Sequence, residues 1–208
     1  MAIIPTVLGI SPGDHGCDRT LSWLARGSHT GGLKALVLRE PHLPKPAYVE
    51  LARRLSPLFG GGLILHSAND GALEVAKSSG WGLHMTSDAD WKMARPSVSG
   101  LLGVSCHTPD DLKRAADAGA DYATVSPVFS PFSKVSDTRP PLGPETLAEW
   151  INEADLPVLA LGGIDSENAS LTIESGVHGV ASIGYLFPEN ADADDCAERA
   201  AKLVASIR

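Results

Sequence analysis

The chain has a deficit of positive charge. It carries 17 lysines and arginines against 25 aspartates and glutamates, a formal net charge of −8. Nucleic acids and anionic membranes repel such a chain, so neither is expected as a partner. An anion-binding site in this protein must therefore rely on backbone N–H groups and a few placed cations.

Cysteine is also scarce. Cys17, Cys106 and Cys196 lie far apart without a C-x-x-C pair, which does not suit a disulfide framework. No apolar run approaches the roughly 18 residues of a membrane-spanning helix. Residues Met1–Pro5 contain neither the basic segment nor the apolar core of a signal peptide. We therefore expect a cytoplasmic protein that makes no membrane contact.

Aromatic residues make up only 5% of the chain, whereas glycine (21) and proline (15) are plentiful. This balance favours a fold with many tight turns and short connections. With 208 residues, 43% of them apolar and 20% charged, the chain is long enough for one globular domain with a sizeable core. No linker or low-complexity segment divides it.

Short apolar segments recur along the chain and are nearly continuous rather than alternating. Such segments are typical of strands that are covered on both faces. The eight segments are Thr6–Ile10, Ala35–Arg39, Gly62–His66, Gly82–Met85, Leu101–His107, Tyr122–Val128, Val158–Ile164 and Gly179–Gly184.

Segments of helical period lie between these strands. They include Pro46–Leu58, Pro109–Ala118, Pro144–Ala154, Glu167–Ser175 and Ala193–Ile207. Eight strands, each followed by a helical segment, predict an α/β fold of the (β/α)8 TIM-barrel type, a single domain over residues 1–208. An open doubly wound sheet is the competing interpretation, but no G-x-G-x-x-G follows the first strand.

In a barrel of this type the active site lies at the C-terminal ends of the strands, and phosphate often binds after strands seven and eight. The seventh strand here ends in Gly162-Gly163, and the eighth ends in Ile183-Gly184. Glycines at both places predict a phosphate site of converging N–H groups, although a tight turn alone would also explain Gly162 and Gly163.

Several segments of the second half together resemble the thiamine-phosphate synthase/TenI family, with matching order and spacing from about Leu101 to Gly184. The first hundred residues match loosely. The matching segments are Gly103-Val104-Ser105-Cys106-His107-Thr108, Ala118-Gly119-Ala120-Asp121-Tyr122, Ser126-Pro127-Val128-Phe129, Lys134, Pro141-Leu142-Gly143 and Leu161-Gly162-Gly163-Ile164.

The resemblance implies one of two activities. The family's synthases join a pyrimidine-methyl diphosphate to a thiazole phosphate and release diphosphate in the presence of Mg²⁺, a reaction in which electrostatic stabilisation of the leaving group dominates. The TenI branch tautomerises a thiazole carboxylate phosphate, which requires a proton shuttle and no metal. Either activity implies a small phosphorylated heterocycle as the binding partner.

The resemblance also implies roles for individual residues. Gly162, Gly163, Ile183 and Gly184 fall where the family binds the thiazole phosphate. Ser105 matches the family's serine on the fifth strand. Ser133 and Lys134 match part of its Thr-x-Thr-Lys diphosphate loop, in which Pro131 here replaces the first threonine.

The first half departs from the synthase pattern. Arg39 is retained from the second-strand Gln-x-Arg-x-Lys, but the glutamine and the lysine are lost. The Asn-Asp that ends the third strand is replaced by His66-Ser67, unless a three-residue shift brings Asn69-Asp70 into its place. Ala89 occupies the position of the second Mg²⁺-binding aspartate, with Asp88 and Asp90 as displaced candidates.

These losses weaken the case for Mg²⁺, because this ion depends on placed carboxylates. We therefore expect no metal and no other cofactor, with Asp70 and Asp88 as the remaining metal candidates. Pro127 occupies the position where tautomerase-type relatives carry their catalytic histidine, so the histidine must come from elsewhere.

The expected catalytic residues are His66, Ser105 and Lys134, and the expected substrate-binding residues are Arg39, Ser133 and Lys134. For His107, the next histidine candidate, and for His84, packing or capping is the simpler interpretation.

We accordingly expect a TenI-like thiazole tautomerase or a diverged relative. Two alternatives stay open. A Mg²⁺-dependent thiamine-phosphate synthase would rebuild its metal site from Asp70 and Asp88 or Asp90. A non-catalytic protein would bind the phosphate ligand without turnover. The sequence leaves a homo-oligomer open.

Overall fold

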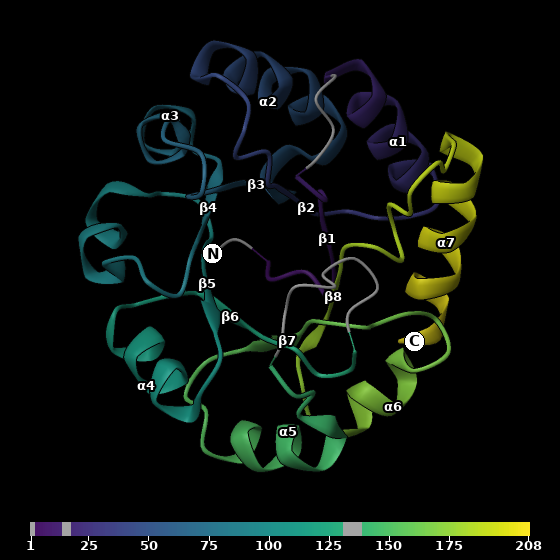
Figure 1. Cartoon of the computed structure of the whole chain (residues 1–208). Helices are drawn as coiled ribbons and strands as arrows, with labels where there is room; N and C mark the ends of the chain where they lie inside the picture. Colours follow the sequence, from purple (N-terminus) through teal and green to yellow (C-terminus); the bar gives the residue numbers. More distant parts are fainter. Residues whose placement is uncertain (1–2, 14–17, 131–138) are drawn as a thin grey trace.

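The computed structural model describes residues 3–13, 18–130 and 139–208. Its strands form one closed parallel barrel in the order β1 to β8 (Figure 1), which confirms the predicted (β/α)8 fold. The strands are β1 (Val7–Ile10), β2 (Leu36–Leu38), β3 (Leu63–His66), β4 (Gly82–Met85), β5 (Leu102–Cys106), β6 (Tyr122–Val125), β7 (Val158–Ala160) and β8 (Gly179–Ser182).

Helices surround the barrel and cover the outer faces of the strands (Figure 1). They are α1 (Asp18–Thr30), α2 (Lys45–Phe59), α3 (Ala72–Ser79), α4 (Pro109–Asp117), α5 (Gly143–Asn152), α6 (Ala169–Glu174) and α7 (Ala193–Ser206).

The connection from β4 to β5 contradicts the expectation of a helical segment after every strand. Between Met85 and Leu102 the chain forms only two short 3₁₀ turns, Trp91–Met93 and Arg95–Ser97. Pro96 disfavours a longer α-helix here, because it has no backbone N–H to donate and its ring crowds the preceding turn.

Several strands end earlier than their apolar runs, and the difference is largest for two of them. The sixth was expected to reach Val128 and the seventh Ile164, but they end at Val125 and Ala160. The apolar residues beyond these ends are loop residues, of which Val128 and Ile164 remain buried. Val128 N–H, for example, donates to Leu161 O at 2.9 Å. Hydrophobicity alone could not mark the end of the strand, because burial continues past it.

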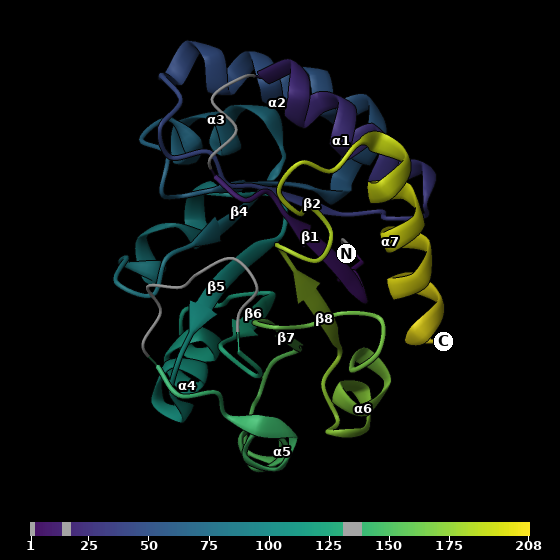
Figure 2. The same ribbon diagram turned by 45° about the vertical axis from the view of Figure 1, so that its right-hand side comes forward.

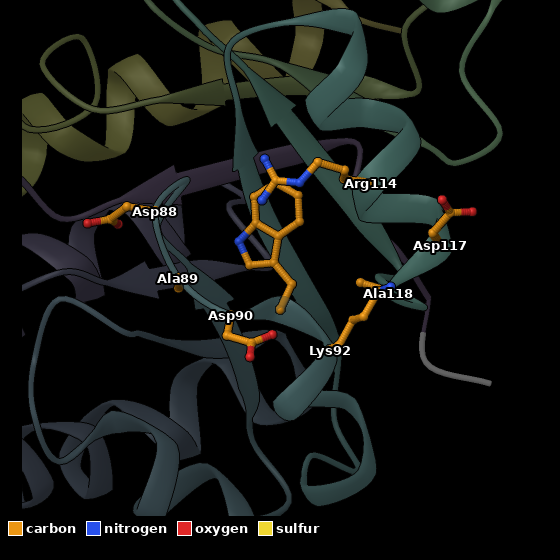
Figure 3. Close-up of a pocket in the computed structure, with 8 residues that line it drawn as sticks. Asp88, Ala89, Asp90, Lys92, Arg114, Asp117 and Ala118 are labelled. Carbon is orange, nitrogen blue, oxygen red and sulfur yellow. The ribbon is translucent and has the colours of Figure 1, made fainter.

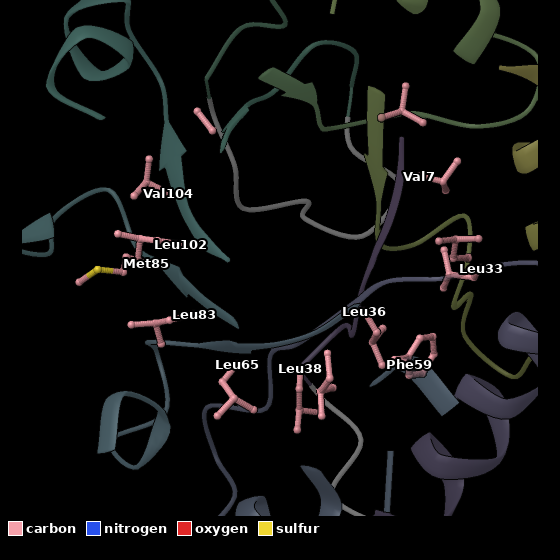
Figure 4. Close-up of a cluster of buried hydrophobic side chains, with 14 of the residues drawn as sticks. Val7, Leu33, Leu36, Leu38, Phe59, Leu65, Leu83, Met85, Leu102 and Val104 are labelled. Atoms are coloured by element: carbon pink, nitrogen blue, oxygen red, sulfur yellow. The ribbon is translucent and has the colours of Figure 1, made fainter. Parts of the chain in front are cut away.

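The core has two layers because side chains alternate across each strand. Outward-facing residues such as Leu36, Leu65 and Val104 pack between strands and helices (Figure 4). Inward-facing residues such as Leu8 and Tyr122 fill the barrel itself. The inner layer forms the floor on which the cavity at the C-terminal strand ends rests.

The first and last helices, α1 and α7, lie side by side (Figures 1 and 2). Gly27 and Gly31 allow this contact, since a Cβ on either would lie 2.0 Å from a carbonyl oxygen of α7. This packing joins the first and the last strand–helix units of the barrel. In the described ranges, no helix has both the length and the apolar character needed to span a membrane.

Candidate functional site

A cavity of about 210 Å³ lies at the C-terminal ends of the strands. Three histidines, two arginines and several hydroxyl groups line it, together with apolar side chains from β1 and from the residues that follow β7 and β8. The lining residues are Ile10, Arg39, His66, Ala68, His84, Thr86, Ser87, Ser105, His107, Ser126, Arg139, Leu161 and Ile183.

His66 is the last residue of β3 and is 7% exposed. Its Nδ1 accepts a hydrogen bond from Ala68 N–H at 3.1 Å. Its own backbone N–H donates to Tyr48 Oη at 3.0 Å, and Tyr48 in turn donates to Leu38 O. The position of His66 is therefore fixed by the neighbouring strand and helix, and its side chain lines the cavity as the sequence predicts.

His84 lies within β4, and both of its ring nitrogens are engaged. Nδ1 lies 3.0 Å from Tyr122 Oη, and Nε2 lies 3.0 Å from Ser105 Oγ. Its ring is also tilted against that of His66, with 5.6 Å between the centroids. The structure thus places Ser105, a predicted site residue, at the end of a hydrogen-bonded chain from three neighbouring strands.

Burial keeps His84 and Tyr122 uncharged. It lowers the pKa of His84 to about 4, because the apolar surroundings disfavour the imidazolium. It also raises the pKa of the Tyr122 hydroxyl well above its usual value. With so low a pKa, His84 stays neutral near pH 7 and is a weak base there, so its role is to orient its neighbours.

His107 follows β5 and also faces the cavity. Its Nδ1–H donates to Ser126 O at 2.9 Å, because a carbonyl can only accept. Its backbone N–H donates to Asp111 Oδ2 in the first turn of α4. The ring of His107 is thereby held at the cavity wall. The contact with the first turn of α4 involves only the backbone N–H, so helix capping does not explain the position of the ring.

Arg39 and Arg139 bring positive charge to the cavity. Arg39 follows β2, where its guanidinium donates to Pro12 O at 2.7 Å and its backbone N–H donates to Ser11 Oγ. Arg139 was not among the predicted site residues. It lies between β6 and α5 and carries no recognisable motif that would have marked it as a site residue.

Backbone groups dominate at the ends of β7 and β8. Within the described ranges, the peptide N–H groups of Gly162, Gly163, Ile183 and Gly184 donate to no acceptor of the protein. The loop after β7 is held by Asn168, whose Nδ2–H donates to Gly163 O at 2.7 Å. Unpaired N–H groups at two neighbouring strand ends can bind an anion.

The two glycines after β7 also permit a close approach of two loops. Gly162 has φ +98° and Gly163 has φ +64°, values that side chains rarely allow. A Cβ on Gly163 would lie 2.5 Å from Ser130 O, and one on Gly162 would lie 2.8 Å from Pro127 Cα. Both positions thus require glycine because of packing and backbone conformation.

The metal candidates lie away from the cavity wall. Asn69 is buried in the turn before α3, where its side chain bonds to backbone groups of Glu40, Leu43 and Gly71. Asp70 is exposed in the same turn. This arrangement shows that His66, and not the Asn-Asp pair, ends β3.

Asp88 and Asp90 line a separate pocket of about 350 Å³ outside the barrel, between the β4–β5 connection and α4 (Figure 3). Arg114 lies over the Trp91 ring there, 4.5 Å from its centroid. No described residue that lines the barrel cavity is a carboxylate. The donors present there do not fit Mg²⁺, which prefers oxygen ligands and placed carboxylates.

The predicted residues Ser133 and Lys134 lie outside the described residues. Cys106 is buried, and burial raises the pKa of its thiol to about 12, which agrees with a packing role. Tyr122 was missed as a participant, although its place two residues before Thr124 and four before Ser126 puts all three on the inward face of β6 and the loop that follows.

Comparison with known proteins assigns a family to most of the chain. Residues 9–186 match the family model described as "Thiamine monophosphate synthase". A "Putative thiamine-phosphate synthase" of Geobacter sulfurreducens is 34% identical over 195 residues, covering 91% of this chain and 88% of that protein. A "Thiamine-phosphate synthase" of Roseiflexus sp. is 36% identical over 172 residues, covering 80% and 71%.

Solved structures support the fold. A thiamine phosphate pyrophosphorylase from Pyrococcus furiosus superimposes with a TM-score of 0.79 at 21% identity, covering 97% of this chain and 95% of that one. A structure described as native KDPGal gives 0.75 at 16% identity, covering 99% and 96%. At these identities the likeness concerns the architecture alone.

Proposed function

Because the chain belongs to the thiamine monophosphate synthase family, we propose that it is a metal-independent, TenI-like tautomerase of a thiazole carboxylate phosphate. One observation carries the proposal: the described wall of the cavity offers three imidazoles and two guanidinium groups but no carboxylate. Tautomerisation needs groups that move protons, whereas diphosphate release needs a divalent cation and its ligands.

The two charged ends of such a substrate match the two kinds of anion site. The phosphate binds to the N–H groups of Gly162, Gly163, Ile183 and Gly184 at the ends of β7 and β8. The carboxylate faces Arg39 and Arg139 across the mouth. The heterocycle between them then lies over Ile10, Leu161 and Ile183, whose side chains exclude water.

The proton transfer is assigned to His66, with His107 as its partner. A tautomerisation removes a proton from one position of the heterocycle and returns one to another, so it needs both an acceptor and a donor. His107 donates through Nδ1–H, which makes its Nε2 the proton-accepting nitrogen. The Nδ1 of neutral His66 accepts from Ala68, so its Nε2 carries the proton.

A Mg²⁺-dependent thiamine-phosphate synthase is the second candidate. The observation in its favour is that relatives 34–36% identical carry that name. Against it stand the carboxylates: Asp70 and Asp88 are exposed and absent from the described cavity wall. Lys134, part of the diphosphate loop in the family's synthases, would serve either activity as a phosphate-binding cation.

Two assays on the same purified protein separate the candidates. In the first, pyrimidine-methyl diphosphate, thiazole phosphate and Mg²⁺ are incubated with the protein, and thiamine phosphate is followed by chromatography, with EDTA in a parallel sample. In the second, isomerisation of the thiazole carboxylate phosphate is followed in EDTA. We expect product only in the second assay. Thiamine phosphate that disappears with EDTA would establish the synthase instead.

A third outcome concerns a protein that binds but does not convert its ligand. Calorimetry with thiazole phosphate detects that case, since binding without turnover in either assay identifies a binding protein. His66→Ala would then leave the affinity unchanged. For the proposed enzyme, turnover is observed, and His66→Ala abolishes it.

A further inference from the structure

A chain of hydrogen bonds crosses the interior of the barrel beneath the cavity. It runs from Tyr122 Oη to His84 Nδ1, and from His84 Nε2 to Ser105 Oγ, with 3.0 Å at each step. The three residues come from β6, β4 and β5. Of them, Tyr122 is fully buried, His84 is 1% exposed and Ser105 lines the cavity. The chain therefore connects the floor of the barrel to the substrate side.

Gly103 makes this connection possible. In the strand register, His84 pairs with Gly103, and Gly103 pairs with Tyr122. A Cβ at Gly103 would lie 2.1 Å from Tyr122 Cζ and 2.4 Å from its hydroxyl oxygen. The phenol ring thus occupies the space that a side chain of β5 would fill, and it reaches across this strand to the histidine.

The direction of the first hydrogen bond follows from burial. His84 Nδ1 is the hydrogen-bond partner of the Tyr122 hydroxyl within the described ranges. A buried O–H without an acceptor is costly, whereas the phenol oxygen tolerates an unused lone pair better. Tyr122 therefore donates, and Nδ1 of the neutral imidazole accepts.

The second hydrogen bond is then fixed as well. A neutral imidazole that accepts at Nδ1 carries its proton on Nε2, which donates to Ser105 Oγ. Thr124, the partner of Ser105 in the register, has a buried hydroxyl that makes no hydrogen bond with the described residues. The hydroxyl hydrogen of Ser105 thus has no acceptor among the described residues of the protein. It is available to a ligand in the cavity.

We propose that Tyr122 and His84 are positioning residues that make Ser105 a hydrogen-bond donor to an acceptor atom of the bound heterocycle. This arrangement excludes Ser105 as a nucleophile activated by His84, because Nε2 cannot take a second proton and stay neutral. It selects ligands that offer a lone pair to Ser105, such as an unsubstituted thiazole nitrogen, over ligands in which that nitrogen is quaternised. The direction of these hydrogen bonds does not depend on the proposed function. The chemistry of the ligand does rest on the proposed function.

The tautomer of His84 can be measured without any ligand. Nitrogen-15 NMR of the imidazole distinguishes a protonated ring nitrogen from an unprotonated one. We expect an unprotonated Nδ1 and a protonated Nε2 that do not change between pH 6 and pH 8. The opposite tautomer, or an imidazolium in this range, would overturn the proposal even if the protein binds thiazole phosphate.

Two variants test the cause of this preference. Tyr122→Phe removes the donor to Nδ1, and we expect its His84 spectrum to shift toward a mixture of tautomers. Tyr185→Phe removes a phenolic hydroxyl that donates to Ser166 and does not contact His84, and we expect it to leave that spectrum unchanged. A His84 spectrum that stays the same in folded Tyr122→Phe would contradict the role of Tyr122.

Binding tests the consequence for the ligand. Calorimetry compares thiazole phosphate with its N-methylthiazolium counterpart, which keeps the phosphate but lacks the ring lone pair. We expect the wild type to prefer thiazole phosphate by about tenfold and Ser105→Ala to lose that preference. Equal binding of the two ligands by the wild type would refute the donor role. Failure to bind either would contradict the proposed function, while the NMR result still decides the direction of the chain.

Discussion

The two sides of the barrel mouth are built from different chemistry. At the ends of β3 to β5, and in the loops after β5 and β6, imidazole and hydroxyl side chains form the wall, and buried contacts hold each of them in place. At the ends of β7 and β8, backbone N–H groups and glycines take over. One side is suited to proton transfer and the other to anion binding, so a substitution should affect turnover or affinity according to its side.

The largest expected effect is on turnover, at His66. His66→Asn keeps an oxygen that can accept from Ala68 N–H but removes the group that exchanges protons. We expect kcat to fall by about 10²–10⁴-fold with thiazole phosphate affinity nearly unchanged. His178→Gln, an exposed histidine that bonds to Ile4 O far from the mouth, serves as the matched control. A similar loss of kcat in both variants, or a loss of affinity in His66→Asn, would contradict the assignment of turnover to one side of the mouth and affinity to the other.

Gly163→Ala should affect affinity and stability instead. The added Cβ meets Ser130 O and Phe129 Cβ, and the residue has φ +64°. Strain and overpacking together should cost about 2–5 kcal/mol of the free energy of unfolding, measured by urea denaturation. We also expect phosphate-ligand affinity to fall at least about tenfold as the loop is displaced.

The matched control for this substitution is Gly61→Ala. A Cβ at Gly61 meets no atom within 4 Å, so both quantities should stay at wild-type values. Wild-type behaviour of Gly163→Ala would show that the glycine side does not depend on this close approach.

The pH dependence of stability tests the buried end of the histidine side. Burial lowers the pKa of His84 to about 4, while an unfolded histidine titrates near 6.5. Between these values the unfolded chain binds a proton that the folded chain does not. The free energy of unfolding should therefore decrease by roughly 3 kcal/mol as the pH falls from 6.5 to 4 because of this group.

Carboxylates also titrate in this range, so the contribution of His84 is the difference between two proteins. Urea denaturation of the wild type and of His84→Gln at each pH gives that difference. Identical slopes would mean that His84 titrates normally in the folded state, against its assignment as a neutral positioning group.

A smaller effect is expected for Arg39→Met. The loss of one guanidinium should lower the affinity for the thiazole carboxylate phosphate by about tenfold. The affinity for the decarboxylated thiazole phosphate should fall much less. Calorimetry with both ligands gives the two ratios, and Arg54→Met on the exposed face of α2 is the control. Equal weakening of the two ligands would assign Arg39 to the phosphate instead.

The smallest effect is expected for Asp88→Asn. Asp88 is exposed and lines the outer pocket, so turnover should stay within about twofold of the wild type. A large loss of turnover that depends on the Mg²⁺ concentration would instead identify Asp88 as a metal ligand.

The glycine side was predictable from the sequence because its signal is local. Gly162, Gly163 and Gly184 stand at recognisable strand ends, and the barrel fold fixes where those ends meet. The histidine side was only partly predictable. His66 and Ser105 could be placed from their strands, but the ring contact of His84 with Tyr122 depends on Gly103, on a strand between them. Arg139 lies between β6 and α5, where no periodic pattern of residues marks it as part of the site.

The central claim, proton transfer by His66 without a metal, is tested most directly by deuterium exchange. The thiazole carboxylate phosphate is incubated in D₂O with EDTA and either wild-type protein or His66→Asn, and deuterium incorporation at carbon is followed by NMR. The account predicts incorporation with the wild type and a rate reduced by about 10²-fold or more with the variant. Exchange that requires added Mg²⁺, or that proceeds equally in both proteins, would contradict it.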